Sequence, residues 1–474
     1  MAPISLDRSN PWLSRERPVR AGIIGCGSFG SGILAQAGST PLLEISAASD
    51  HDLEAARQAY LRGGVTEEEI AQCDTAGAAL RAFEAGKRVI VADPLLLLGL
   101  PLEVIVEATG SPEAGARHAE IALGAGQHVA MVNKEADVAV GPFLKRLADE
   151  AGLVYTAVHG DQHGLLTALV AWACRLGLEV LCGGKSRDLE IVCDPVAATV
   201  SNGTQQIRLE AEPAHCFEPL SPEHRSDPRA SIEAQLAARC AALGDWSRIG
   251  GWDLVELVIA ANATGLAPDL PSGVHCPPVY ASEIPQVLCP AEMGGILRSR
   301  GVIDAVTCLR RPHETGLGGG VFLVVTTATP HARKVLSRGG VCHGVDGSAT
   351  LITRPYHLLG VEAIHSILTA ALLGVPTAAM DYRPRFDVFA QAAKDLPAGT
   401  VLGDDHCPEI TAFIGPAAPL SNDRSLPLHL ANGNRLARSV TRGSVITREM
   451  VVAPAASALW TLRARQDAYF FPGS

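Results

Sequence analysis

The sequence predicts an α/β protein with a doubly wound parallel sheet, a second α+β domain and a small β-rich C-terminal domain. Three observations support this fold class. Strand-like apolar segments alternate with helix-like segments between residues 19 and 132, as is typical of a parallel sheet covered by helices. A glycine-rich turn follows the first strand-like segment. The chain has 474 residues, enough for two to four domains of about 100–200 residues each.

The first domain is expected to span residues 18–160. A polar, proline-containing segment precedes the first apolar run, so the domain begins near residue 18. Spacing of apolar residues then predicts strands and helices in alternation, and the first three of these elements form a βαβ unit. The predicted strands are 19–24, 43–49, 104–108 and 128–132, and the predicted helices are 33–37, 53–61 and 112–123.

The second domain is expected to span residues 161–380, and the third residues 385–453. A strand, a glycine-containing turn (HGDQHG), a helix and a strand (EVLCGGK) follow residue 153. Residues 195–250 are irregular and polar, and a β-rich run covers 319–326. The pattern predicts a long apolar helix over 355–373 that returns to the first domain. After residue 384 the chain shows a short β and turn pattern.

Composition excludes several classes of protein. The net charge of -11 and the pI near 5.8 provide no positive field for nucleic acid. No apolar run reaches the roughly 18–20 residues of a membrane-spanning helix. Twelve cysteines without a C-x-x-C pair, after an N-terminus that lacks an apolar signal core, indicate reduced thiols and a cytoplasmic protein. We therefore expect a small-molecule substrate, no nucleic-acid or membrane partner, and a homo-oligomer.

The strongest local motif is the loop GCGSFG, which comprises Gly25, Gly27, Ser28, Phe29 and Gly30. Its first glycine permits a tight turn, the second allows close approach of a pyrophosphate, and the third allows a helix to pack on a strand. Twenty residues further on, a carboxylate at Asp50 is placed to bind the ribose diol of NAD. The motif predicts a dinucleotide-binding domain of the Rossmann type. Asp50 favours NAD, although Arg57 leaves NADP open.

The ends of the next strands predict the rest of the cofactor site and the start of the catalytic site. Thr109 and Gly110 follow a buried strand at the carboxyl edge, where open α/β sheets bind ligands. The following strand ends in Met-Val-Asn-Lys-Glu-Ala-Asp, which places Lys134 and the carboxylates of Glu135 and Asp137 beside the expected nicotinamide. The alternative for Lys134 is a solvated ion pair with Glu107 or Asp137.

Three further residues are candidates for catalysis. Lys185 ends a strand after two glycines, where its ammonium could hold or protonate a carbonyl oxygen, unless it is a surface lysine. Asp161 is either catalytic or metal-binding, or it only caps the next helix. Glu256 lies within an apolar run, which indicates a partly buried carboxylate and hence a functional candidate.

Several other residues are better explained by structural roles than by catalysis or metal binding. His159 and His163 have the i, i+4 spacing of a metal pair, but glycines at 160 and 164 favour a loop. His357 is best explained as a structural histidine. Cys26 is a small filler of the glycine loop, because covalent chemistry there would block the cofactor.

The chain resembles the homoserine dehydrogenase-like oxidoreductases through V-E-A-T-G and the later N-K pair, and M-V-N-K-E-A-D is similar to the deoxyxylulose phosphate reductoisomerase-like enzymes. The resemblance covers about residues 19–453 and also rests on A-N-A-T-G-L, G-G-I-L, R-P-Y-H-L and the tail motifs K-D-L-P-A-G and L-A-R. It implies a catalytic second domain and a SAF-like third domain. The chain departs from the family at Gln162 and His163, where glutamate and proline are expected, and between Asp253 and Glu256.

Motifs and resemblance together predict an NAD(P)-dependent oxidoreductase acting on a small oxygenated carbonyl compound or its alcohol, such as a sugar phosphate, sugar acid or semialdehyde. In this scheme Lys134 and Lys185 stabilise the developing alkoxide. The resemblance implies a possible isomerase step, which would require a divalent metal bound by carboxylates such as Asp161 and Glu135. The alternatives are a plain dehydrogenase and a catalytically silent cofactor-binding scaffold. The C-terminal domain is expected to serve assembly or site closure.

Overall fold

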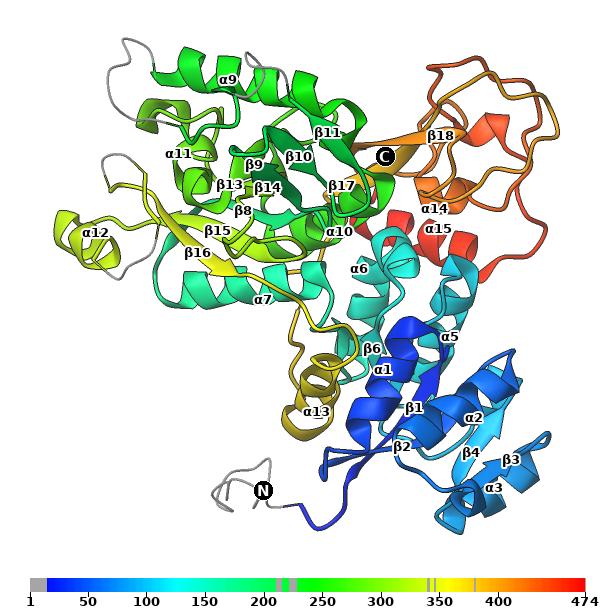
Figure 1. Ribbon diagram of the computed structural model, residues 1–474. Helices are drawn as coiled ribbons and strands as arrows, with labels where there is room; N and C mark the ends of the chain where they lie inside the picture. Colours follow the sequence, from blue (N-terminus) through cyan, green and yellow to red (C-terminus); the bar gives the residue numbers. More distant parts are fainter. Residues whose placement is uncertain are drawn as a thin grey trace.

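The computed structural model describes residues 15–209, 215–220, 228–338, 342–344, 347–378 and 381–473. The N-terminal residues on which we based the expectation of no signal segment lie outside this range. Three units are built around three separate sheets, and the C-terminal unit lies beside both of the others (Figure 1). No helix within the described ranges is long and apolar enough to cross a membrane.

The first unit is a seven-stranded sheet in the order β3-β4-β2-β1-β5-β6-β7, and every neighbouring pair is parallel. Its strands are mostly buried apolar runs, as expected for a sheet covered on both faces. The predicted doubly wound α/β class is confirmed. The strands are β1 (Val19–Ile24), β2 (Leu43–Ser49), β3 (Ile70–Gln72), β4 (Arg88–Val91), β5 (Val104–Glu107), β6 (His128–Met131) and β7 (Tyr155–Ala157).

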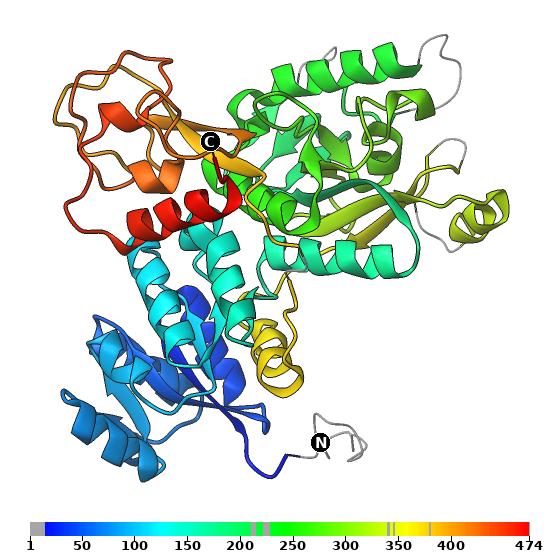
Figure 2. The ribbon, with the colours of Figure 1, turned by 180° about the vertical axis from the view of Figure 1, so that it is seen from behind.

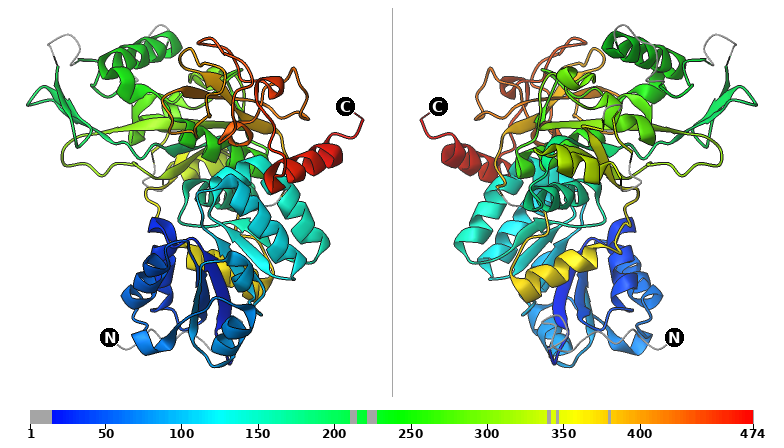
Figure 3. Two further views of the ribbon diagram at one scale, coloured as in Figure 1. Left: turned by 90° about the vertical axis from the view of Figure 1, so that its right-hand side faces the viewer. Right: turned by 90° about the vertical axis from the view of Figure 1, so that its left-hand side faces the viewer.

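Helices connect these strands and cover the sheet. One face carries α1, α2 and a helix from much later in the chain, α13 (Ala363–Leu373), which packs against β1, β5, β6 and β7. Figure 3 shows α13 alongside the strands of the first unit. The connecting helices are α1 (Ser28–Ala37), α2 (Leu53–Arg62), α3 (Ala76–Glu84), α4 (Pro94–Leu98), α5 (Pro112–Gly124) and α6 (Lys134–Glu150).

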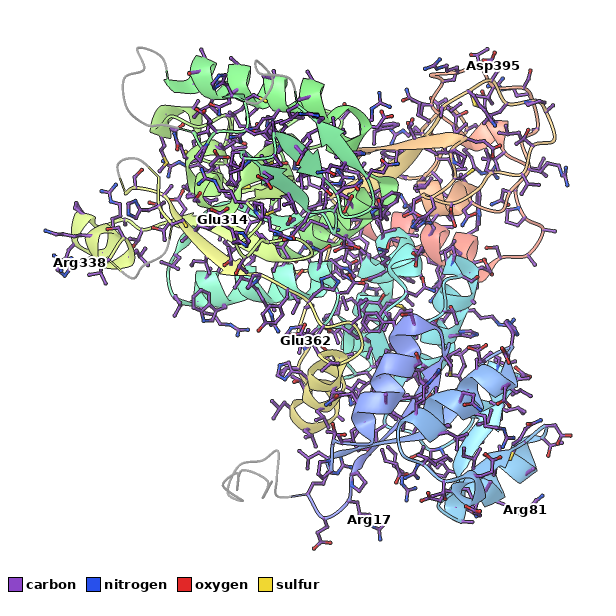
Figure 4. All side chains as sticks on the ribbon, viewed as in Figure 1. Arg17, Arg81, Glu314, Arg338, Glu362 and Asp395 are labelled. Atoms are coloured by element: carbon purple, nitrogen blue, oxygen red, sulfur yellow. The ribbon has the colours of Figure 1, made fainter. Side chains whose placement is uncertain are left out.

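The segment 355–362 that leads to α13 is not helical, contrary to the predicted helix over 355–373. Gly360 has a φ of +76°, and a Cβ there would lie 2.8 Å from the backbone of Gly32 in α1. The segment therefore passes over α1 as an irregular stretch and a turn at 359–362 before the helix begins. Arg354 pairs with Glu362 across this segment, and Figure 4 shows Glu362 where the chain crosses between units.

The second unit is a nine-stranded mixed sheet with α7 and α10 packed on one face and α9 and α11 on the other. Its central strand is β14, which pairs in parallel with β8, β9, β12 and β13, and β8 pairs antiparallel with β15. The strands are β8 (Glu179–Ser186), β9 (Ile191–Asp194), β10 (Thr199–Ser201), β11 (Gln206–Arg208), β12 (Ala267–Pro268), β13 (Pro278–Tyr280), β14 (Val302–Arg310), β15 (Val321–Thr326) and β16 (Thr350–Arg354). The main helices are α7 (Gln162–Arg175), α9 (Pro228–Leu243), α10 (Gly251–Thr264), α11 (Ile284–Val287) and α12 (Pro330–Leu336).

Helix α7 begins two residues after Gly160, so His163 and Gly164 are helical and the predicted loop over this segment is wrong. A Cβ on Gly164 would lie 2.1 Å from the carbonyl oxygen of Val158. Glycine is required at this position because the first turn of α7 packs directly against the chain that leaves β7. It does not mark a loop.

The C-terminal unit contains a two-stranded antiparallel sheet of β17 (Phe386–Ala392) and β18 (Ile410–Pro416), the short helix α14 (Leu428–Ala431), and the final helix α15 (Ala458–Phe470). Helix α15 was not predicted, and it lies beyond the expected boundary at residue 453. It packs against α5 and α6 of the first unit, as Figure 2 shows from behind. The C-terminal unit therefore shares an apolar interface with the sheet that carries the glycine loop.

Candidate functional site

The glycine loop has the geometry that its sequence predicts. Gly25 has a φ of +97°, in the left-handed region, and a Cβ there would lie 2.6 Å from the carbonyl oxygen of Ala108. A Cβ on Gly30 would lie 2.0 Å from the carbonyl oxygen of Gly25, so α1 packs tightly on the turn. A Cβ on Gly27 would meet no atom within 4 Å. The open space at Gly27 lies at the N-terminus of α1, where a helix binds anions.

A pocket of about 650 Å³ opens over this loop at the carboxyl edge of the sheet. Five of the residues predicted to bind the cofactor line it, namely Gly25, Gly27, Asp50, Thr109 and Gly110. Ser28 and Phe29 form the first turn of α1 beside the pocket. The sequence analysis missed other lining residues that no motif marks, including His51, Arg117 and His118.

Asp50 holds the glycine loop in addition to facing the pocket. Its Oδ2 accepts the backbone N–H of Cys26 at 2.7 Å, and its Oδ1 accepts that of Asp52 at 2.9 Å. Burial, followed by the charge of Asp50, raises the pKa of the Cys26 thiol to about 12, which fits an unreactive filler. Arg57 pairs with Glu67 outside the pocket.

A buried hydrogen-bond network connects the pocket to the start of α6. Glu107, at the end of β5, is fully buried and accepts the backbone N–H of Thr109 at 3.0 Å. The side-chain amide of Asn133 donates to Thr109 Oγ1 at 3.1 Å and to the carbonyl of Ser111 at 2.8 Å. Asn133 also caps α6, whose first residue is Lys134. The side chain of Asn133 thus connects the wall of the cofactor pocket to the start of α6, where Lys134 lies.

The structure brings three of the four predicted catalytic residues into direct contact. Lys134 Nζ lies 2.6 Å from Glu256 Oε1, and Lys185 Nζ pairs with the other oxygen of Glu256. Lys185 Nζ also lies 2.8 Å from Asp253 Oδ1. The side chain of Lys134 is 20% exposed, whereas that of Lys185 is 2% exposed. Only Lys134 therefore reaches solvent, and Glu256 bridges the two lysines.

Charge pairing keeps both lysines protonated. Burial disfavours the ammonium of Lys134, but the carboxylates of Glu256 and Asp161 hold its pKa above the ordinary value. Burial acts in the same way on Lys185, and Glu256 and Asp253 outweigh it, so its pKa is also raised. The cluster presents one partly exposed cation with a fixed direction, which is the arrangement needed to stabilise developing negative charge.

Asp161, the fourth predicted catalytic residue, lies at the carboxyl end of β7 and caps α7. Its Oδ1 accepts the backbone N–H of Gln162 at 2.8 Å and lies 3.6 Å from His163 Nδ1. Burial alone would raise the pKa of Asp161, but His163 and then Lys134 and Lys185 hold it well below its usual range. The lowered pKa means that Asp161 stays in the ionised carboxylate form next to these positively charged side chains.

His163 is a residue that the sequence analysis weighed only as a metal ligand. Its side chain is 1% exposed, and neither ring nitrogen has a hydrogen-bond partner among the residues that the structure describes. Burial opposes the imidazolium, but the charge of Asp161 raises the pKa of His163 above its usual value. The ring of His159 instead contacts that of His365, with ring centroids 5.1 Å apart and an interplanar angle of 31°, so His159 and His163 have different partners.

The remaining candidates have structural partners. Asp137 is buried and accepts the hydroxyls of Tyr155 at 2.8 Å and Tyr382 at 3.0 Å. His357 Nδ1 lies 2.6 Å from the carbonyl oxygen of Gly319, in agreement with a structural role. Asp137 therefore does not face the cofactor pocket as the sequence analysis expected.

The expected metal site at Asp161 and Glu135 does not fit a divalent ion. Lys134, Lys185 and His163 already surround Asp161 with positive charge. Within the described part of the chain, neither carboxylate belongs to a group of three closely spaced ligating side chains. A divalent cation would have to displace or discharge these cations, so we derive no metal-dependent step here.

The C-terminal unit contributes polar groups near the same cluster, which no local motif indicated. Its helix α14 contacts α6 and carries His429, which is 2% exposed. Burial lowers the pKa of His429 to about 4, and the charges acting on it include Asp405 and Lys134. Asp405 is likewise among the charges that raise the pKa of Glu135, after burial. Residues from three units thus converge around Lys134.

One segment of the chain matches a known family model. Residues 250–363 match the model of the catalytic domain of oxidoreductase DRL, and this segment contains both Asp253 and Glu256. The second unit thus carries an oxidoreductase-type catalytic segment. The match covers less than half of the chain. No curated protein sequence matches it.

The matches to solved structures are distant. A 3-ketoreductase from Actinomadura kijaniata in complex with NADP and TDP-benzene shares 16% identity over 75% of this chain and 90% of that chain, with a TM-score of 0.34. The WlbA dehydrogenase from Bordetella pertussis, solved with NADH and UDP-GlcNAcA, shares 20% identity over 38% of this chain and 46% of its own, with a TM-score of 0.25. The 1-deoxy-D-xylulose 5-phosphate reductoisomerase from Zymomonas mobilis, solved with NADPH, shares 16% identity over 52% of this chain and 57% of its own, with a TM-score of 0.30.

Proposed function

We propose that the chain is an NAD(P)-dependent oxidoreductase that transfers a hydride between the nicotinamide and a small oxygenated carbonyl compound or its alcohol. The observation that carries this proposal is the continuity between the glycine-loop pocket and the lysine cluster. Asn133 contacts Thr109 at the pocket wall and immediately precedes Lys134. The match of residues 250–363 to an oxidoreductase catalytic domain supports the same conclusion.

The glycine loop would hold the pyrophosphate of the cofactor at the N-terminus of α1, because Gly27 leaves that space open. Asp50 would accept a ribose hydroxyl while it keeps the loop in place. When bound, the nicotinamide would supply or accept the hydride. Thr109 and Gly110 would line its site.

Lys134 is the cation placed to stabilise the substrate oxygen. It is the more exposed lysine, and Glu256 fixes its ammonium. Lys185 is too deeply buried to share this contact without rearrangement, so we assign it to positioning Glu256. Asp161, at the same edge of the sheet and 14% exposed, would act as a charged hydrogen-bond acceptor that orients the substrate, because its lowered pKa makes it a weak base.

The geometry favours the plain dehydrogenase among the enzyme alternatives. The isomerase step requires a divalent ion at Asp161 and Glu135, and the cations around Asp161 do not fit one. The substrate class, a sugar phosphate, sugar acid or semialdehyde, and the choice between NAD and NADP remain part of the proposal. Arg117 at the pocket wall offers a contact for a 2′-phosphate that Arg57, paired with Glu67, does not.

A cofactor-reduction screen tests the proposal. Purified protein is incubated with NAD⁺ or NADP⁺ and a panel of aldonates, sugar alcohol phosphates and amino-acid semialdehyde precursors, and absorbance of the reduced nicotinamide is followed. We expect at least one substrate to give turnover that Lys134→Met slows by about 10²–10³-fold. Products are then analysed for a rearranged carbon skeleton, which would indicate isomerisation. Tight cofactor binding without turnover on any substrate would favour the silent scaffold.

A further inference from the structure

A second polar site lies in the C-terminal unit, where three consecutive residues bring together ligating atoms. One oxygen each of Asp404 and Asp405 and one ring nitrogen of His406 lie within 4.8 Å of one another. His406 Nδ1 is 3.1 Å from Asp405 Oδ1 and 4.0 Å from Asp404 Oδ1. Carboxylate oxygen and imidazole nitrogen are the ligands that zinc and similar divalent transition metals take in proteins.

An unsatisfied carboxylate shows that this cluster is more than an exposed acidic loop. The side chain of Asp405 is only 1% exposed. Its Oδ2 is buried and has no hydrogen-bond partner among the residues that the structure describes. A buried carboxylate oxygen without a donor is unfavourable unless a cation or another ligand satisfies it.

A buried histidine beside the cluster is unsatisfied in the same way. His429 is 2% exposed, and within the described ranges neither of its ring nitrogens has a hydrogen-bond partner. Among charged groups, Asp405 and Asp404 act on it most strongly. Asp405 Oδ2 and both ring nitrogens of His429, in different parts of the C-terminal unit, are therefore buried and have no hydrogen-bond partner among the described residues.

The site has room for an ion and lies against helix α10. A cavity of about 240 Å³ is lined by Asp405, His406 and the first residues of α10. The ring of His406 stacks on Trp252 with centroids 4.9 Å apart and an interplanar angle of 12°. A Cβ on Gly251 would lie 2.9 Å from Asp405 Cβ. The loop is thus held directly against the helix that carries Asp253 and Glu256.

We propose that Asp404, Asp405 and His406 bind one divalent transition-metal ion of the zinc or manganese class. The ion would fix the orientation of the His406 ring, which stacks on Trp252 in the first turn of α10. This site is separate from Asp161 and is independent of the proposed hydride transfer, because its occupancy is measured without turnover.

The test uses the full-length protein after treatment with a chelator. Zn²⁺ and Mn²⁺ are titrated separately by calorimetry, and Trp fluorescence is recorded in parallel because Trp252 stacks on His406. We expect one ion per chain and a fluorescence change on binding. The isosteric substitution Asp405→Asn and the substitution His406→Ala should each weaken binding at least tenfold. Trp252→Phe should remove the fluorescence change and keep the affinity.

Two matched variants control for nonspecific effects. Asp423→Asn removes an exposed carboxylate of the same unit, and His331→Ala removes an exposed histidine of α12. Both should bind the ion as the parent does. Absence of saturable one-site binding for both metals would overturn the proposal, as would unchanged affinity in folded Asp405→Asn and His406→Ala proteins. Since the side chain of His406 is 63% exposed, its removal tests the site even if Asp405→Asn fails to fold.

Discussion

At the residue scale, the two lysines that the motifs placed together have different roles. Lys134 is partly exposed and is held by one carboxylate, whereas Lys185 is buried between two. An ammonium that is preorganised and still accessible can stabilise a transition state, because no reorganisation is required when charge develops. A buried ammonium satisfied on both sides instead fixes the groups around it.

Replacing the lysines by methionine should therefore give different results. Lys134→Met removes an oxyanion donor, and we expect kcat to fall by about 10²–10³-fold with little change in stability. Lys185→Met removes the cation between two buried carboxylates and, among the described residues, leaves Glu256 paired only with Lys134 and Asp253 only with Arg187 at 3.4 Å. We therefore expect a loss of about 3–5 kcal/mol in unfolding free energy in addition to lost activity. Single-turnover kinetics and urea denaturation measure the two effects. Equal stability of both variants would contradict the division of roles.

The glycine loop gives a prediction about binding without chemistry. A side chain at Gly27 meets no protein atom within 4 Å, so Gly27→Val should fold normally. Its methyl groups would occupy the space of the pyrophosphate, and calorimetry should detect no binding of NAD(H) or NADP(H). Gly124→Val is the matched control, because a Cβ at Gly124 also meets open space but lies at the far end of α5. Normal cofactor affinity in Gly27→Val would refute the assignment of the pocket.

The histidines on either side of Asp161 should respond to pH in opposite directions. The pKa of His163 is raised in the folded state by Asp161, so its stabilising effect is full below about pH 6.5 and is lost as the pH rises through its folded value. Burial lowers the pKa of His159 to about 4, so protonation of the unfolded state makes this residue destabilising in acid. His163→Gln should therefore cost more stability at pH 5.5 than at pH 9.

His159→Gln is the control of opposite sign, and its cost should be smaller at pH 5.5 than at pH 9. Urea denaturation at the two pH values measures both differences. If His163→Gln lost the same free energy at both pH values, the ion pair with Asp161 would not contribute to folding.

At the scale of elements, helix α6 connects the three units. Its first residue is Lys134, its apolar side packs on the sheet, and its outer side is covered by α15. Gln466 of α15 accepts the backbone N–H of Phe143 within α6, whose hydrogen-bond ladder Pro142 interrupts. The side chain of Gln466 in α15 thus provides a hydrogen-bond acceptor at the point where Pro142 interrupts α6, the helix that begins at Lys134.

Leu462 tests this packing because it is fully buried in α15. Leu462→Ala should lower the unfolding free energy by about 2–5 kcal/mol through the lost transfer energy and the cavity left behind. Val452→Ala, at an exposed position of the same unit, should cost less than about 0.5 kcal/mol. Urea denaturation compares the two. A cost for Leu462→Ala near that of the control would mean that α15 does not stabilise the native fold.

At the scale of the whole molecule, the C-terminal unit is tied to both others. The backbone N–H of Ala458 in α15 donates to Glu113 Oε1 of α5 in the first unit at 2.6 Å. The side chain of Asn262 in α10 accepts the backbone N–H of Phe386 at 2.9 Å. The sequence suggested that this unit serves assembly or site closure. The structure places it close to the catalytic cluster.

A chain that ends at Asp381 keeps every residue of the cofactor pocket, so we expect it to bind dinucleotide with unchanged affinity. It loses the cover over α5 and α6, however, and we expect a lower Tm and a tendency to aggregate. Calorimetric titration and thermal unfolding monitored by circular dichroism measure the two properties. Loss of dinucleotide affinity in a folded truncation would show that the C-terminal unit shapes the pocket.

The sequence by itself determined what depends on residues close together in the chain. The turn at Gly25, the alternation of strands and helices, and the placement of Thr109, Lys134 and Asp161 at strand ends all follow from local periodicity and from the fact that parallel strands end at one edge. Tertiary structure decided the rest. Glu256 meets Lys134 across 122 residues and Lys185 across 71, and no local pattern encodes such a meeting. The same holds for His429 and Asp405, because long-range packing fixes which buried charges become neighbours, and those neighbours set the pKa and the role of each group.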